Sequence, residues 1–539
     1  MERALHHQMA AIENIICGGI SGIIFALFSG QPLNILSATG PTLIFEKILY
    51  DFCTQSHWEF LPFRFWVGVW VALLLFILVA TDASALVGLI TRFTEEAFAT
   101  LISVVFIVQA FQKLYEIGYE APITIHPEEV LQSTCHCRLE VNDPNGTTYS
   151  KNLSVGVTRC HELGGTPEGL QCFFKPDVYM FSVVLTFGTF TIAYALNKFR
   201  VSSFFSSKIR NTVSDFGVFI AIVLMTLLTH TIGLEVPSLK VPSSLRPTLD
   251  RAWIVDIMNI EHNWVIGIAF FPAAFYTILI VMDQQITAVI VNRKDNKLKK
   301  GYGYHLDLLI ITILVLICSI LGLPFYVAAT VLSVMHVDSL KVESECAAPG
   351  EKPQFLGVKE QRLTAILSHI IILCSVFLTS LIKLVPLPVL TGIFLYMGVV
   401  SLLGQQFVQR IALLFMPIKH QPDYTWLRTV KMKRVHLFTI IQIASIVALF
   451  AVKFTSSISM VFPLMLVLMV IIRMYLLERI FSPQELVALD DKVCGFTEIM
   501  TPPTKRRPKI ALNSTTDEES SVAFRPRAKS RNGSVPFTP

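Results

Sequence analysis

Residues 29–41 read Ser-Gly-Gln-Pro-Leu-Asn-Ile-Leu-Ser-Ala-Thr-Gly-Pro, and residues 322–331 read Gly-Leu-Pro-Phe-Tyr-Val-Ala-Ala-Thr-Val. Each stretch combines helix-breaking glycine and proline with small and apolar residues, and a short, mostly apolar run follows each. This pattern predicts an unwound segment that leads into a half-helix. The alternative is an ordinary loop with a short re-entrant turn.

The composition around these two segments is that of a membrane protein. The chain has 539 residues, of which 53% are hydrophobic and 15% charged, with a mean hydropathy of +0.59. Soluble domains carry about 25% charged residues. The formal net charge of +5 comes mainly from short connections and a polar tail, so it reports orientation in the bilayer and gives no indication of nucleic-acid binding.

Apolar runs long enough to cross a bilayer recur along the chain. We expect spans at 13–36, 63–86, 95–117, 176–196, 214–234, 264–291, 307–323, 361–386, 388–404, 435–453 and 457–478, with shorter elements at 40–52 and 325–336. The fold class is therefore an all-α polytopic membrane protein. Paired broken segments in the two halves of such a chain are typical of inverted-repeat transporters, whose half-helix N-termini offer N–H groups to an anion near the bilayer midplane.

The loop 118–175 carries the strongest indication of sidedness. It contains the sequons Asn145-Gly-Thr and Asn152-Leu-Ser, which predict glycosylation of Asn145 or Asn152 on an extracellular face. It also holds four candidate disulfide cysteines, Cys135, Cys137, Cys160 and Cys172. Four cysteines can pair in three ways, and the sequence does not distinguish among them. With this loop outside, the basic clusters that follow and the C-terminus lie in the cytosol.

Two acids stand near or within apolar spans. Asp283 lies in the span 264–291, with Thr287 one turn later on the same face. A carboxylate inside a membrane helix is costly and usually marks an ion path, and with a hydroxyl it supplies the hard oxygen ligands that sodium prefers. The alternative is an acid solvated at the helix end. Asp82 is a second buried-acid candidate, although its place at a helix terminus also fits a solvated acid.

The remaining candidate residues follow from the broken segments. We expect an ion-binding site at the two half-helix N-termini. Its residues are Thr39 and Gly40 in the first segment and Ala329, Thr330 and Val331 in the second. For His230 and His369, in apolar spans, we expect packed, hydrogen-bonded side chains, with proton relay as the alternative. For Glu95 and Glu96 we expect solvated charges at a helix start and no role in transport.

At these residues the chain resembles the bicarbonate transporter family that includes the red-cell anion exchanger and the sodium-coupled bicarbonate cotransporters. The likeness runs from about residue 11 to 492. The matching motifs are Gly30-Gln-Pro-Leu33, Ala80-Thr-Asp-Ala-Ser84, Thr91-Arg-Phe-Thr-Glu-Glu96, Met282-Asp-Gln-Gln-Ile-Thr-Ala-Val-Ile-Val-Asn-Arg-Lys294, Gly303-Tyr-His-Leu-Asp-Leu308, Ala328-Ala-Thr-Val331, Phe355-Leu-Gly-Val358, Phe394-Leu-Tyr-Met-Gly398 and Pro417-Ile-Lys-His-Gln-Pro422.

The resemblance implies a fold of seven plus seven inverted elements, a core domain that rocks against a gate domain, and a homodimer in the plasma membrane. It also implies that a first membrane helix and a large cytosolic domain usually precede the stretch near Ala11, so this chain is expected to lack the first helix. The expected parts are an N-terminal stub (1–12), the first core part with the start of the gate (13–117), the extracellular loop (118–175), gate helices (176–234), an extracellular connection (235–263), the second core half (264–386), the second gate half (387–479) and a disordered cytosolic tail (480–539).

Two positions indicate the transport mode within the family. Exchangers of the family typically carry Glu where this chain has Asp283, and Arg where it has Leu332, whereas the sodium-coupled members resemble this chain at both. An acid without a neighbouring fixed cation leaves room for a co-bound sodium that balances bicarbonate or carbonate. We therefore expect sodium-coupled bicarbonate transport that regulates intracellular pH, with sodium as a transported ion and no cofactor.

Several alternatives stay open. One is a chloride/bicarbonate exchanger of the same fold, and another is a truncated, non-transporting subunit that dimerises with a complete carrier. An enzyme is not expected, because no nucleophile and base or metal-ligand cluster accompanies the acids. The acidic pair Asp490-Asp491 resembles a motif proposed to contact carbonic anhydrase, although acid pairs on tails are usually solvated.

Overall fold

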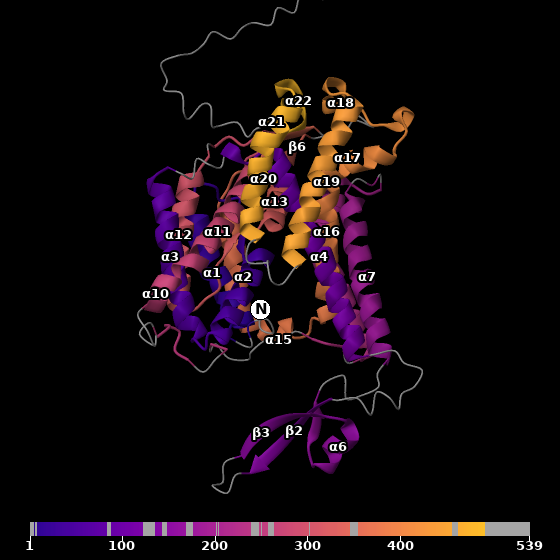
Figure 1. Cartoon of the computed structure of the whole chain (residues 1–539). Coiled ribbons are helices and arrows are strands. Elements are labelled where there is room, and N and C mark those ends of the chain that lie inside the picture. Colours follow the sequence, from indigo (N-terminus) through magenta and orange to yellow (C-terminus); the bar gives the residue numbers. More distant parts are fainter. Residues whose placement is uncertain are drawn as a thin grey trace, which may run out of the picture. The chain divides into compact units, whose positions relative to one another are not determined.

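The computed structural model describes Leu5 and residues 8–82, 88–121, 135–142, 148–168, 176–200, 202, 204–234, 236–238, 247–248, 251–256, 264–300, 302–344, 354–454 and 462–490. These residues form a predominantly helical fold (Figure 1). Eight described helices are long and apolar enough to span a bilayer, and two bent pairs, α8–α9 and α16–α17, raise that number to ten. The predicted all-α polytopic class is confirmed.

The elements follow the predicted order, with short strands at the broken segments and in the loop. The helices are α1 (Ala11–Phe28), α2 (Gly40–Gln55), α3 (Phe60–Ala80), α4 (Arg92–Glu120), α6 (Val157–Glu162), α7 (Pro176–Phe199), α8 (Ser207–Asp215), α9 (Gly217–Ile232), α10 (Trp264–Ile268), α11 (Phe270–Val291), α12 (Tyr304–Leu321), α13 (Thr330–Ser339), α14 (Leu363–Cys374), α15 (Thr379–Ile382), α16 (Leu387–Leu403), α17 (Gln406–Phe415), α18 (Thr425–Thr429), α19 (Met432–Phe454), α20 (Phe462–Ile471), α21 (Glu478–Ile480) and α22 (Pro483–Leu489). The strands are β1 (Leu36–Ser37), β2 (Cys135–Asn142), β3 (Thr148–Val155), β4 (Thr166–Glu168), β5 (Val327–Ala328), β6 (Lys341–Glu343) and β7 (Phe355–Val358).

Several helices end earlier than their apolar runs. Helix α1 ends at Phe28, because the following Ser-Gly-Gln-Pro stretch cannot continue it. Helix α12 ends before Gly322, whose left-handed backbone (φ 61°) caps the helix before the second broken segment. The expected span 361–386 is interrupted at Ser375, where the chain tightens into a 3₁₀ turn and the serine hydroxyl donates to the Ile372 carbonyl.

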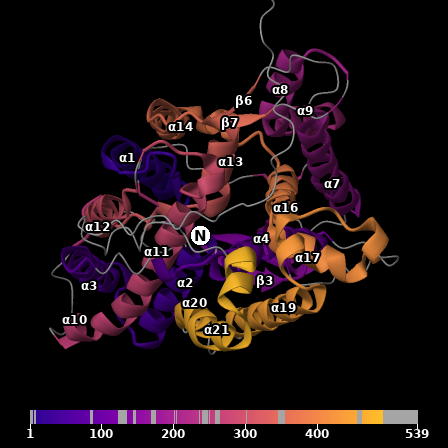
Figure 2. The same cartoon turned by 90° about the horizontal axis from the view of Figure 1, so that it is seen from above.

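Helix α11 is the central packing element. It contacts α2, α3, α12, α13 and β5, and every residue from Met282 to Val291 is buried. Helix α1 packs against α12 and α14 beside it, while a second set of contacts joins α16 to α4 and α7, and α7 to α9. Figure 2 shows α1, α3, α11 and α12 near one another, apart from α7 and α16. These contacts form two packing groups, which we call the α11 group and the α16 group, and α20 contacts α11 in the first and α4 in the second.

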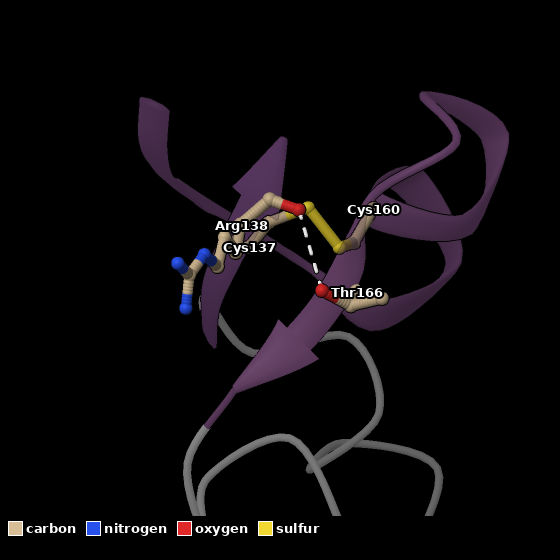
Figure 3. The surroundings of a disulfide bond; sticks show 4 residues. All are labelled: Cys137, Arg138, Cys160 and Thr166. Atoms are coloured by element: carbon tan, nitrogen blue, oxygen red, sulfur yellow. Dashed lines mark hydrogen bonds between the residues drawn. A yellow bond between two sulfur atoms is a disulfide. The ribbon is translucent and has the colours of Figure 1, made fainter. Parts of the chain in front are cut away.

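The loop expected between two spans contains a small sheet in the order β3-β2-β4, with both pairs antiparallel. A disulfide between Cys137 and Cys160 joins β2 to α6, so two of the predicted cysteines pair (Figure 3). Cys135 begins β2 and Asn152 lies within β3. The positions of Asn145 and Cys172 fall outside the described residues.

The C-terminal boundary differs from the expected disordered tail at 480–539. Order continues through α22, which starts with a capping box between Ser482 and Glu485. The Asp490 carboxylate is buried, where it accepts hydrogen bonds from Arg473 Nε (2.7 Å) and from the Phe93 backbone N–H in the first turn of α4 (2.8 Å). Asp490 is thus a structural cap with a buried carboxylate, and it does not stand on a solvated tail.

Candidate ion-binding site

The two broken segments pair with one another through their short strands. Strand β1 pairs antiparallel with β5, with Leu36 opposite Ala328. The Ala329 backbone N–H donates to the Ile35 carbonyl (2.9 Å), and the Ile35 N–H donates to Ser333 Oγ (3.0 Å). Because α2 begins shortly after β1 and α13 shortly after β5, both helix N-termini lie close to this strand pair.

Both helix N-termini have uncapped N–H groups. The N-cap residues Thr39 and Ala329 form no side-chain cap bond. The first N–H groups of a helix have no intrahelical partner and carry the positive end of its dipole. A Cβ placed on Gly40 would meet no heavy atom within 4 Å, so there is open space at the start of α2.

Helix α11 connects to both N-termini through side chains one turn apart. Asp283 is 1% exposed, and its Oδ2 accepts a hydrogen bond from Thr39 Oγ1 (2.8 Å). The Thr287 hydroxyl lies 2.8 Å from the Thr330 hydroxyl and 3.2 Å from the Ala328 carbonyl oxygen. The structure therefore gathers the predicted residues of both segments around one stretch of α11, and Val331 completes the first turn of α13.

The gathered atoms provide two kinds of ligand. Carboxylate, hydroxyl and carbonyl oxygens are hard ligands suited to a small cation, and free N–H groups suit an oxyanion. The acid also accepts a hydrogen bond from the N-cap of α2, and a helix N-terminus favours negative charge. The arrangement can therefore hold a cation and an anion side by side, with neither charge buried alone.

Asp82 does not belong to this site, and its interpretation as a buried acid is wrong. Helix α3 ends at Ala80, before the acid. The Asp82 side chain is 86% exposed, 3.8 Å from His305 Nδ1.

The two histidines also lie apart from the site. His369 is buried with Nδ1 2.9 Å from the Gly18 carbonyl oxygen, which confirms the expected packed side chain. His230 is exposed on α9, so the expectation of a packed side chain is wrong at that position.

Glu95 and Glu96 are buried and paired, contrary to the expectation of solvated charges. Glu95 forms an ion pair with Arg293, which follows α11, and Glu96 pairs with Arg410 of α17 (2.6 Å). Burial and the neighbouring Arg92 lower the pKa of Arg293 to about 10, so the guanidinium stays charged at cellular pH. The sequence shows only a Thr-Glu-Glu helix start, whereas the cationic partners lie some 200 and 314 residues further along the chain.

A polar cavity of about 260 Å³ opens beside these pairs, at the start of α4. Its lining includes Arg92, Glu95, Arg293, Gln405, Gln406 and Trp426. Arg92 is 3.6 Å from Asp295 and donates to Gln406 Oε1 (2.7 Å). Helix α4 therefore connects, through its first turn, the end of the α11 group to α17.

The sequence did not predict two further features of this region, namely the contact of Gln284 and the Glu46–Arg64 pair. Gln284, next to Asp283, is fully buried and accepts from the Ala328 N–H (2.9 Å). Glu46 and Arg64, each 1% exposed, pair between α2 and α3. A lone arginine in an apolar span was the available signal for the second case, because such a residue requires a buried partner.

A family model described as the HCO3- transporter integral membrane domain matches residues 1–494. The chain belongs to this bicarbonate transporter family. The family resemblance drawn from the motifs is thereby confirmed.

Similar members of the family come from mammals. The chain is 46% identical to the human sodium-driven chloride bicarbonate exchanger (97% of this chain, 47% of the relative), and 46% identical to the rat electroneutral sodium bicarbonate exchanger 1 (90% and 46%). The rat sodium bicarbonate cotransporter 3 is also 46% identical (90% and 41%). The chain thus spans about half the length of the curated relatives it matches.

Among solved structures, the transmembrane domain of a cyanobacterium bicarbonate transporter, BicA, matches with a TM-score of 0.45 at 14% identity. The match covers 83% of this chain and 92% of that chain.

Proposed function

We propose that this member of the bicarbonate transporter family carries bicarbonate or carbonate across the plasma membrane together with sodium. The observation that carries the proposal is the Thr39–Asp283 hydrogen bond, which holds a buried acid at the N-terminus of a half-helix. In this proposal Asp283, Thr287 and the neighbouring hydroxyls bind sodium. The N–H groups that begin α2 and α13, at Thr39, Gly40, Thr330 and Val331, bind the anion. Ala329, whose own N–H donates to the Ile35 carbonyl, holds the start of α13 at the site.

The residue that follows the second N-terminus supports coupling to sodium. Leu332 occupies the third position of α13, directly after the Thr330 and Val331 positions, so this position contributes an apolar side chain and no fixed cation. A buried carboxylate and a divalent or monovalent oxyanion would repel one another without a positive charge between them. A transported sodium ion supplies that charge.

The proposed mechanism is alternating access between two domains. The α11 group corresponds to the expected core and the α16 group to the expected gate, and the broken segments belong to two inverted repeats. The core would carry the ions past the gate, so that contacts between α4 and the end of α11 break and re-form in each cycle. We also propose a homodimer, with the C-terminus in the cytosol.

Chloride countertransport is the second candidate. It is favoured by the name of one relative, the sodium-driven chloride bicarbonate exchanger, because that name lists chloride beside sodium and bicarbonate. Both candidates require sodium, and they differ in the need for chloride on the opposite side.

The test is recovery of intracellular pH after an acid load in cells that express the chain. Recovery should require external bicarbonate and sodium together. Depleting cellular chloride should leave the rate unchanged under cotransport and abolish it under chloride countertransport. Recovery no faster than in vector-only cells, at demonstrated surface expression, would reject the proposed function.

A further inference from the structure

Gln284 holds the second broken segment against α11. Its side chain is 0% exposed, and its Oε1 accepts a hydrogen bond from the Ala328 backbone N–H (2.9 Å). Thr287, on the neighbouring part of the same helix, donates to the carbonyl oxygen of Ala328 (3.2 Å). The two α11 side chains therefore satisfy both polar groups of one β5 residue.

This contact determines which way the Gln284 amide points. The Ala328 N–H is a donor, so the amide oxygen must face it and the NH₂ group must occupy the other branch. The Gln284 Nε2 atom is buried and has no hydrogen-bond partner among the described residues. A buried donor that stays unsatisfied is costly, so a partner is expected in the functioning protein.

The place of this NH₂ group is defined by its neighbours. Ala328 immediately precedes Ala329, the N-cap of α13, and the amide is planar and compact, so Nε2 lies beside the α13 N-terminus. On α11, Gln284 directly follows Asp283, whose carboxylate faces the start of α2 through Thr39. The donor is thus held at the residue that precedes the N-cap of α13, on the same helix as Asp283.

An NH₂ group cannot coordinate a cation, and its ligand must offer an acceptor. We propose that Gln284 donates a hydrogen bond to the transported oxyanion, bicarbonate or carbonate. Adjacent residues of α11 then divide the two ions: Asp283 binds sodium and Gln284 binds the anion. This inference rests on the proposed function, and it adds to that function a ligand that belongs to neither half-helix.

The test uses two variants with different predicted effects. Gln284→Glu keeps an oxygen that accepts from Ala328 N–H but replaces the donor by a negatively charged oxygen. Gln284→Met removes both groups at similar volume. Each should raise the bicarbonate concentration for half-maximal flux about tenfold or more, as expected for the loss of a hydrogen bond to a charged group. The sodium concentration for half-maximal flux should not rise in Gln284→Glu, because the added charge favours the cation.

The matched control is Gln442→Met. Gln442 lies in α19 and is 0% exposed, and its amide donates to the Phe93 carbonyl (3.2 Å) and accepts from Arg410 (2.6 Å), with no hydrogen bond to either broken segment. The same substitution there should leave the bicarbonate concentration for half-maximal flux unchanged. An equal increase in Gln442→Met would assign the effect to the loss of any buried amide and would overturn the proposal.

A binding measurement separates a ligand from a positioning residue. In detergent-purified protein, bicarbonate with sodium should raise the thermal unfolding midpoint of the wild type, and Gln284→Glu should lose the bicarbonate-dependent part while it keeps the sodium-dependent part. An unchanged bicarbonate shift and an unchanged half-maximal concentration in Gln284→Glu would overturn the inference alone. A wild type with neither sodium-dependent flux nor a bicarbonate shift would reject the proposed function itself.

Discussion

At the scale of single residues, Asp283 is the acid on which sodium coupling depends. The change Asp283→Asn preserves shape but removes the charge that balances the cation. Loss of one charge-assisted ligand in a buried site costs about 1.5–3 kcal/mol, which corresponds to an increase of about ten- to a hundredfold in the half-maximal sodium concentration. The measurement is bicarbonate-driven pH recovery against sodium concentration, with surface expression matched.

The chain provides a control for this substitution. Asp82→Asn makes the same chemical change at an 86% exposed acid, so its sodium curve should coincide with that of the wild type. A sodium curve for Asp283→Asn that also coincides with the wild type would remove Asp283 from the site.

Thr39 connects the first half-helix to that acid through its hydroxyl. Replacement by Ile fills the N-terminus of α2 and removes the donor, so we expect flux to fall to the background. Thr39→Ser keeps the hydroxyl and should retain most of the flux. The measurement is sodium-dependent pH recovery in both variants. Equal flux in the two, at equal surface delivery, would place the anion elsewhere.

Residue types with a short-range signal were predictable from the sequence. Asp283 and Thr287 are four residues apart in an apolar span, so their shared face follows from helix geometry alone. Glu95 and Gln284 show why other residues were missed. Their partners, Arg293 and Ala328, are distant in sequence, and only the folded chain brings them together.

At the scale of elements, the Glu46–Arg64 pair fixes the first half-helix. Arg64 Nε and Nη2 both donate to the Glu46 carboxylate (2.7–2.9 Å), and Tyr276 of α11 donates to the same acid (3.1 Å). Arg64 Nη2 also donates to the Leu323 carbonyl (2.9 Å), at the start of the second broken segment. This network therefore sets the position of α2 relative to α3, α11 and the second segment.

Removing one partner of this pair leaves a buried charge unpaired. We expect Arg64→Met to destabilise the protein by about 3–5 kcal/mol, whereas the double change Glu46→Met with Arg64→Met should recover most of this loss. The measurement is the thermal unfolding midpoint of purified protein, with surface delivery as a second readout. A double variant no more stable than the single one would show that the Leu323 contact, and not the ion pair, carries the stability.

Element types were predictable where composition determines them, and boundaries were not. The Gly/Pro-rich segments correctly predicted the helix starts at Gly40 and near Thr330. The end of order was misplaced at residue 480, because the stability of α22 depends on a local cap and on the buried Asp490–Arg473 pair. Such a pair has no signature in a window of neighbouring residues.

At the scale of the whole molecule, the first turn of α4 joins the two packing groups. Glu95 pairs with Arg293 at the end of α11, while Glu96 pairs with Arg410, which also donates to Gln442 of α19 (2.6 Å). Only the first of these pairs crosses from the α16 group to the α11 group. If the groups move relative to one another, the Glu95–Arg293 pair must break during each cycle, and the Glu96–Arg410 pair need not.

Cysteine cross-linking tests this difference in one experiment. In the double variant Glu95→Cys with Arg293→Cys, a short thiol cross-linker should reduce flux to the vector-only background, because it ties the two groups together, and uncross-linked protein should retain measurable flux.

The control is Phe106→Cys with Phe394→Cys, whose wild-type rings stack with centroids 6.0 Å apart between α4 and α16, within one group. Cross-linking this control pair should leave most of the flux, since no relative motion of the two groups is restrained. Sodium-dependent pH recovery before and after cross-linking gives the comparison, with the cross-linked fraction determined on a gel. Full flux in completely cross-linked Glu95→Cys with Arg293→Cys would mean that this contact persists through the cycle, and the division between core and gate would then have to lie elsewhere in the molecule.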